Sequence, residues 1–132
     1  MEGKTRVLLC DDEPDFLEAV SFRLQSQGYC VSTVSGGEEA IEAVRKDPPD
    51  ILFLDIRMPG IDGLETLRRI RNFNKDLPVV LLSANYQDER SFLTANKLGA
   101  SGFFPKIGPL AQLTNVIRIN CRVDARLNPA SA

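Results

Sequence analysis

Short apolar runs alternate along the chain with longer segments in which apolar residues recur every three or four positions. Three of the runs, VLLC (7–10), ILFLDI (51–56) and VVLL (79–82), are almost uninterrupted, which is typical of strands in a parallel sheet that is covered on both faces. CVSTV (30–34) and GFF (102–104) are weaker runs of the same kind. We therefore expect five strands.

The segments between the runs have the periodicity of amphipathic helices, with expected ranges 15–27, 38–46, 64–73, 87–98 and a last helix that starts at Pro109. Gly28 and Gly99 follow two of these ranges, where glycine commonly ends a helix. Ser35 and Glu38 have the spacing of a capping box. Alternating strands and helices predict an α/β fold with a doubly wound parallel sheet and right-handed crossovers.

The chain has 132 residues, 43% of them apolar, and a formal net charge of −2, which suits one domain with a real core. We assign this domain to residues 1–132, with a core at about 5–122 and a tail, 123–132, that could begin a linker. The charge balance argues against direct nucleic-acid binding. No run reaches the ~18 apolar residues of a membrane span, and the N-terminus lacks the pattern of a signal peptide. We expect no membrane association and a cytoplasmic location.

The chain contains no histidine and three cysteines, Cys10, Cys30 and Cys121, without a CxxC pair. Small buried thiols are the ordinary role of such cysteines. The lack of histidine excludes a Ser-His-Asp or Cys-His nucleophile and a histidine metal site, so any phosphohistidine must come from another molecule. No Gly-x-x-x-x-Gly-Lys-Ser/Thr loop supports nucleotide binding.

Charged and hydroxylic side chains follow four of the expected strands at their carboxyl ends, the edge at which sites form in open parallel sheets. They are Asp11, Asp12 and Glu13 after the first strand, Asp55 at the end of the third, Ser83 at the end of the fourth and Lys106 after the fifth. Each alone has an ordinary structural role, as a helix N-cap, a turn residue or a solvated surface charge. Independent explanations for all of them at one edge are implausible together, so we interpret the set as one site.

Three crowded carboxylates repel one another unless a cation lies among them. Because the available ligands are oxygens, with no histidine or cysteine in the set, the expected cation is Mg²⁺ rather than zinc. Such an ion leaves coordination positions for water and for a phosphoryl oxygen. One carboxylate is then available as a nucleophile, while Lys106 neutralises phosphoryl charge and the Ser83 hydroxyl donates to a phosphoryl oxygen.

Together these features resemble the receiver domain of two-component response regulators, the CheY-like superfamily. The resemblance is carried by the Asp11-Asp12 pair, LDIRMPGIDG (54–63), LLSA (81–84) and GASGFFPK (99–106), within about residues 5–122. It implies a flavodoxin-like (βα)5 fold with a five-stranded sheet in the order 2-1-3-4-5. In that order the first and third strands are neighbours, which brings the three aspartates together.

The resemblance also implies a role for each residue of the site, and it implies that Pro59, Gly60 and Gly63 shape the loop beside the site. The expected roles are Asp55 as phosphoacceptor and metal ligand, Asp12 as a direct Mg²⁺ ligand, Asp11 as a ligand largely through water, the backbone carbonyl of Arg57 as a further ligand, Lys106 as the phosphoryl contact, and Ser83 and Phe103 as switch residues.

The function that the resemblance implies is a phosphorylation-controlled switch rather than an enzyme with turnover. A histidine kinase, a phosphotransfer protein or a small acyl phosphate donates the phosphoryl group to Asp55 with Mg²⁺ present. The switch residues then move, and the face formed by the fourth helix, fifth strand and fifth helix changes its partner preference. The sequence leaves open an attached output domain, a separate effector protein and phosphorylation-driven homodimerisation.

One departure from the family keeps an alternative function open. Proline usually follows the lysine in this family, often through a cis bond, whereas here Ile107 follows Lys106 and Pro105 precedes it. A cis bond before isoleucine costs ~2.5–4 kcal/mol, so we predict a changed loop between Lys106 and Pro109. The alternative is a receiver-like protein-interaction module that signals without phosphorylation.

A second alternative, an Mg²⁺-dependent phosphatase with an aspartate nucleophile, requires an acid two residues after that nucleophile. Arg57 occupies this position, which disfavours the alternative. Arg57 and Asn85 stand two residues after Asp55 and Ser83, close enough to control the approach of water. Our hypothesis is that the Arg57 side chain shields the acyl phosphate and slows its hydrolysis.

Overall fold

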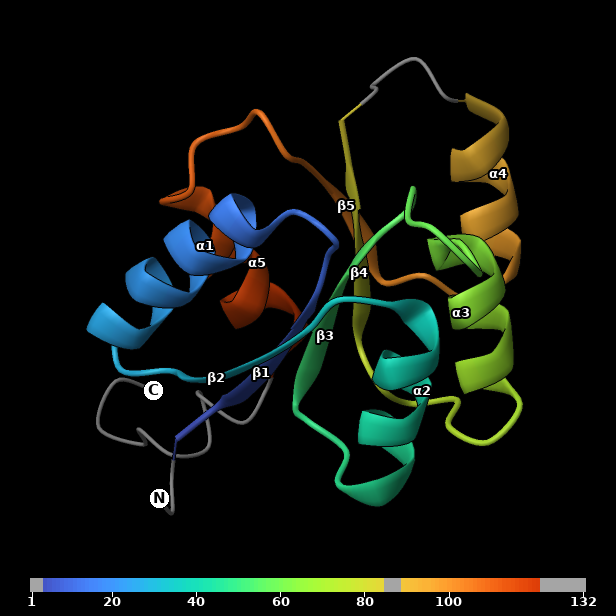
Figure 1. The fold of residues 1–132 in the computed structure, drawn as a ribbon, viewed down its shortest axis with the longest axis horizontal. Coiled ribbons are helices and arrows are strands. Elements are labelled where there is room, and N and C mark those ends of the chain that lie inside the picture. The colour runs from blue at the N-terminus through green and yellow to red at the C-terminus, as the bar shows by residue number, and fades with distance from the viewer. Residues whose placement is uncertain (1–3, 85–88, 122–132) are drawn as a thin grey trace.

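Five parallel strands form one sheet that lies between two layers of helices (Figure 1). The structure is a computed structural model, described for residues 4–84 and 89–121. The strand order is β2-β1-β3-β4-β5, as the resemblance implied. Helices α1 and α5 pack on one face of the sheet, and α2, α3 and α4 pack on the other.

The elements follow one another as five βα units, close to the expected ranges. The strands are β1 (Arg6–Cys10), β2 (Cys30–Val34), β3 (Ile51–Asp55), β4 (Val79–Ser83) and β5 (Gly102–Pro105). The helices are α1 (Pro14–Ser26), α2 (Gly37–Lys46), α3 (Gly63–Arg71), α4 (Glu89–Lys97) and α5 (Gln112–Asn120).

Burial follows from the position of each strand in the sheet. Every residue of β3, at the centre, is buried, whereas β2 at the edge has only exposed and half-buried residues. Apolar side chains of β1, β3 and β4 point alternately to the two faces and build two cores. This explains why the runs that form β1, β3 and β4 are continuously apolar, since both of their faces are covered.

Two local predictions are wrong. The N-cap of α2 is Gly36, whose side chain can accept no hydrogen bond, and the Ser35 hydroxyl bonds Glu39 Oε1 at 2.9 Å; the Ser35–Glu38 capping box is absent. Cys10 and Cys121 are buried as expected, but Cys30 is exposed because it begins the edge strand.

Some sequence predictions lie outside the described residues. These are the structure of the tail at 123–132, the first two residues of the expected helix at 87–98, and the position of Asn85. Among the residues that the structure describes, no helix combines the length and the apolar character needed to cross a bilayer.

Candidate functional site

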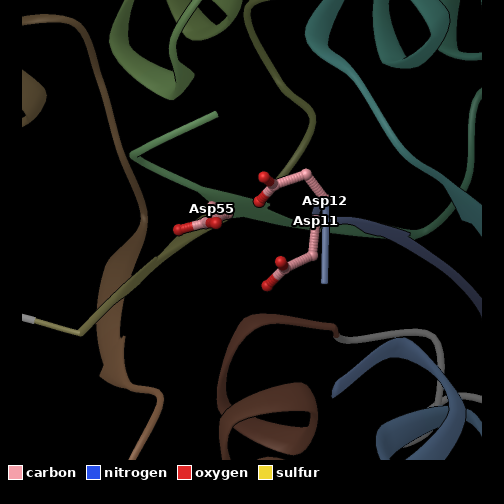
Figure 2. Close-up of side chains that lie close together, drawn as sticks. All are labelled: Asp11, Asp12 and Asp55. Atoms are coloured by element: carbon pink, nitrogen blue, oxygen red, sulfur yellow. The ribbon is translucent and has the colours of Figure 1, made fainter. Parts of the chain in front are cut away.

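The three aspartates meet because β1 and β3 are adjacent parallel strands. Cys10 pairs with Leu54 in the register of these strands, so the residues that follow, Asp11 and Asp55, leave the sheet side by side. Each of the three carboxylates offers an oxygen within 4.8 Å of the others. Figure 2 shows these side chains clustered at the carboxyl ends of the two strands.

Asp55 is the buried nucleophile candidate of this cluster. It is 4% exposed, Asp11 is completely buried, and Asp12 is exposed. Burial and then the nearby charge of Asp11 raise the pKa of Asp55 from 3.8 to about 6, although Lys106 opposes the shift. Burial thus disfavours the ionised form of Asp55, and the neighbouring carboxylate of Asp11 adds to the effect.

Lys106 reaches the cluster from the end of β5. Its backbone N–H donates to the Ser83 carbonyl at 2.9 Å, which ties it to β4. Its ammonium lies 2.9 Å from Asp11 Oδ2 and 3.5 Å from Asp55 Oδ2, and the side chain is only 8% exposed. Burial lowers the pKa of Lys106, but ion pairs with Glu13, Asp11 and Asp55 outweigh this effect and raise the pKa above its usual value. The lysine stays charged.

The contact between Asp11 and Lys106 is an ion pair rather than a well-directed hydrogen bond. Asp11 Oδ2 is buried and has no partner with hydrogen-bond geometry, although the ammonium is 2.9 Å away. The other oxygen, Oδ1, accepts the backbone N–H of Glu13 at 2.9 Å. The burial of Asp11 Oδ2 is therefore offset by the charge of the Lys106 ammonium.

The loop after Lys106 has a form that does not require the usual proline. The Gly108 N–H donates to the Pro105 carbonyl at 2.9 Å, which closes a tight turn around the lysine. No cis peptide bond occurs in the described part of the chain, and Ile107 is 74% exposed at the tip of the turn. Despite this different loop, Lys106 points toward Asp55.

The loop between β3 and α3 packs directly under the site. The Arg57 N–H donates to Asp55 Oδ1 at 3.3 Å and the Gly63 N–H to the Ile56 carbonyl at 2.7 Å. Gly60 has φ +79°, a conformation that favours glycine. A Cβ at Gly63 would lie 2.3 Å from the Asp55 carbonyl oxygen. These glycines let the chain turn back closely against Asp55.

The switch candidates lie on the β4–β5 side of the site. Ser83 ends β4 and lines an open depression together with Asp12, Asp55, Arg57 and Lys106. Phe103 is half-buried in β5 and packs edge-on against Phe92 of α4, with ring centroids 4.4 Å apart. The sequence predictions thus fall in one place, except that Phe103 contacts α4 rather than the depression.

The donor set at this edge suits a hard divalent cation. Three carboxylates converge, their ligand atoms are all oxygens, and the single ammonium of Lys106 beside them balances only part of their charge. Oxygen-rich, partly solvated sites of this kind favour Mg²⁺. The residues present therefore fit the ion that the sequence implied.

Two residues around Lys106 had no predicted role. Glu13 pairs with the ammonium, and the ring of Phe16 lies 4.8 Å from it. Glu13 stood in the predicted set of acids, but its partner is 93 residues away in the sequence. Only the fold shows this pairing.

The parallel sheet with helices on both faces, and with acids and a lysine at its carboxyl edge, defines an α/β protein of the doubly wound class. The chain belongs to the response regulator receiver domain family, whose model matches residues 7–118. Receiver domains are signalling phosphoacceptors of two-component systems, which receive phosphoryl groups from histidine kinases.

Relatives and solved structures agree with this membership. The chain is 39% identical over 114 residues to the response regulator MprA of Mycobacterium leprae, covering 86% of this chain and 49% of that protein. It is 36% identical to the response regulator protein TrrA of Thermotoga maritima. The structure of TrrA in complex with Mg²⁺-BeF matches with a TM-score of 0.79 over 87% of this chain and 97% of that one. CheY4 of Vibrio cholerae matches with a TM-score of 0.82 at 27% identity over 89% of this chain and 98% of that one.

The chain spans about half or less of the length of these curated relatives. It covers 49% of MprA, and 25% of the C4-dicarboxylate transport regulator DctD of Pseudomonas aeruginosa, to which it is 36% identical over 89% of its own length.

Proposed function

We propose that Asp55 accepts a phosphoryl group and that the domain is a phosphorylation-controlled switch. The observation that carries the proposal is the position of Asp55: a buried carboxylate at the end of a central strand, with two further aspartates within 4.8 Å and an ammonium at 3.5 Å. This position suits a nucleophile facing a dianionic group.

The transfer reaction follows from the groups present. A carboxylate oxygen of Asp55 forms a bond to phosphorus as the bond from phosphorus to the donor's leaving group breaks. The donor is the phosphohistidine of a kinase or phosphotransfer protein, because this chain has no histidine, or a small acyl phosphate. Lys106 compensates the charge on the phosphoryl oxygens, and the exposed edge at Asp12 and Arg57 admits the donor.

Mg²⁺, when bound, would neutralise the carboxylates and the charge of the transferring group. Asp12 and Asp55 would hold it directly, Asp11 largely through water, and the Arg57 carbonyl would complete the protein ligands. The Arg57 N–H already bonds Asp55 Oδ1 at 3.3 Å, which keeps that residue beside the carboxylate. This arrangement orients the carboxylate before any donor arrives.

The signal would leave the site through β4, β5 and α4. Ser83 lies at the site, and Phe103 in the next strand packs on Phe92 of α4. A shift of Ser83 toward a phosphoryl oxygen would open space beside β5, and the Phe103 ring would follow. Because the ring contacts α4, the α4-β5-α5 face would then differ between the two states. Helix α4 also carries the exposed side chain of Leu93, which a protein partner or a second copy would cover.

A mass measurement tests the function. Incubation with acetyl phosphate and Mg²⁺ should add one phosphoryl group to wild type, as seen by intact-mass spectrometry, and EDTA should prevent the addition. Asp55→Asn should gain none, whereas Asp76→Asn, which changes an exposed carboxylate outside the site, should behave as wild type. No adduct from acetyl phosphate or from a histidine kinase would favour the phosphorylation-independent interaction module instead.

A further inference from the structure

Glu13 holds the ammonium of Lys106 in addition to the aspartates of the site. Glu13 Oε1 and Asp11 Oδ2 contact Nζ, the second at 2.9 Å, while Asp55 Oδ2 lies farther away at 3.5 Å. The lysine side chain is 8% exposed although the Glu13 side chain is 62% exposed. The Glu13 carboxylate therefore lies between the ammonium and solvent.

A second group closes the environment of the ammonium. The Phe16 ring, one turn along α1 from Glu13, lies 4.8 Å from Nζ, within the range of a cation–π contact. Residues at the start of α1 thus contact the Lys106 ammonium in addition to the aspartates of the site.

The backbone around Glu13 fixes the starting point of its side chain. Its N–H donates to Asp11 Oδ1 at 2.9 Å, and Pro14 is the first residue of α1. A residue before proline is restricted to extended angles, and Glu13 has φ −99° and ψ 107°. The sequence Asp-Asp-Glu-Pro therefore fixes the backbone position from which the Glu13 side chain reaches Lys106.

We propose that Glu13 is a positioning residue that competes for the Lys106 ammonium and sets how readily the ammonium passes to a phosphoryl oxygen. The inference rests on the proposed function, since it requires the phosphoryl group to arrive on Asp55. An ammonium has three N–H donors, and arriving phosphoryl oxygens must compete with the carboxylates for them. Glu13 is the most exposed of these acceptors, so its contact is the one most easily replaced.

Removal of the competing charge should strengthen the binding of a phosphoryl mimic. With Mg²⁺ present, we expect Glu13→Gln to bind beryllofluoride about two- to fivefold more tightly than wild type, a modest effect because solvent screens Glu13. Fluorine NMR of bound beryllofluoride measures the affinity. Glu18→Gln, which neutralises another exposed carboxylate of α1, is the matched control and should bind as wild type does.

A double-mutant cycle decides whether Glu13 acts through the lysine. Urea unfolding of metal-free wild type, Glu13→Gln, Lys106→Gln and the double variant gives the coupling between the two side chains. We expect Glu13→Gln to raise the unfolding equilibrium constant about two- to fivefold more with Lys106 present than in the Lys106→Gln background. This readout needs neither metal nor anion.

The outcomes separate this inference from the proposed function. Absence of coupling, or beryllofluoride binding by Glu13→Gln no tighter than that of Glu18→Gln, would overturn the role of Glu13. Failure of wild type itself to bind beryllofluoride with Mg²⁺ would count against the proposed function. In that case the unfolding cycle still reports whether Glu13 holds Lys106.

Discussion

Asp55 is an acid at the end of a strand whose other four residues are apolar and fully buried. Burial and the charge of Asp11 raise the pKa of Asp55 to about 6. In the metal-free protein at neutral pH, the ionised carboxylate therefore lowers the free energy of unfolding. The sequence predicted which residues gather at this edge. It could not predict that Glu13 shares Lys106, because that contact joins residues 93 positions apart.

The pKa of Asp55 gives a pH dependence with a definite sign. The folded protein binds this proton more tightly than the unfolded chain, whose value is near 3.8, so the free energy of unfolding rises as pH falls from about 6 to 4. One proton contributes at most about 1.4 kcal/mol per pH unit. Asp55→Asn has no carboxylate to ionise at this buried position, so it should be more stable than wild type at pH 7 without metal.

Urea unfolding in EDTA at several pH values measures the effect. Because other groups also titrate, the informative quantity is the stability of Asp55→Asn minus that of wild type. We expect this difference to shrink from pH 7 to pH 5. A difference that stays constant would show that Asp55 has an ordinary pKa.

The three cysteines should differ sharply in reactivity. Burial, followed by the charges of Asp11 and Asp55, raises the pKa of Cys10 to about 12, and Cys121 is 3% exposed. Only Cys30 is exposed, and reaction requires an accessible thiolate. A thiol reagent at pH 8 should label one cysteine of the native protein and three in urea. Rapid native labelling of Cys30→Ser would contradict this burial.

At the scale of elements, the apolar runs correctly predicted all five strands. Prediction failed at the start of α2 and was incomplete for the loop after Lys106. Gly36 is the N-cap of α2 and Gly37 is its first residue. A Cβ at Gly37 would lie 2.1 Å from Thr66 Oγ1 and 2.7 Å from Ile61, so this close tertiary packing requires glycine there. The Ser35 hydroxyl bonds Glu39 instead of capping the helix. Spacing in the sequence alone suggested a capping box.

The loop after Lys106 was also predicted only in part from the sequence. The sequence indicated a changed loop, which the structure has, but not that Pro105 and Gly108 form a turn that keeps the lysine at the site. A Cβ at Gly108 would lie 3.1 Å from the Pro105 carbonyl oxygen. The order of the strands likewise came from resemblance, since apolar periodicity does not specify which strands pair.

The close approach of Gly63 to Asp55 predicts a sensitive position. Gly63→Ala places a Cβ 2.3 Å from the Asp55 carbonyl oxygen, and backbone atoms must move to make room. Overpacking of this kind costs ~1–3 kcal/mol. We expect a loss of this size in urea unfolding, with slower phosphorylation because Asp55 shifts.

Gly102→Ala is the control, since a Cβ there meets no atom within 4 Å. It should change stability by less than about 1 kcal/mol. Equal losses in the two variants would mean that the fit of Gly63 against β3 is not what the loop requires.

At the scale of the whole molecule, the apolar cores that support the sheet are separate from the polar groups of the site. Two apolar cores hold β3 and β4 rigidly from both faces, and the polar groups collect at one edge. The class of fold was predictable because alternating apolar runs and amphipathic segments admit few arrangements. The direction of signalling depends on side-chain contacts such as Phe92 with Phe103, which no periodicity reveals.

The central claim is that Asp55, among several clustered acids, is the residue that takes the phosphoryl group. The most direct test is to phosphorylate the protein with acetyl phosphate and Mg²⁺, reduce the acyl phosphate with borohydride, and map the reduced residue by peptide mass spectrometry. The account predicts conversion of Asp55 alone to homoserine, and none when EDTA replaces Mg²⁺. Conversion of Asp11, Asp12 or Glu13 in its place, or conversion of Asp55 without Mg²⁺, would contradict it.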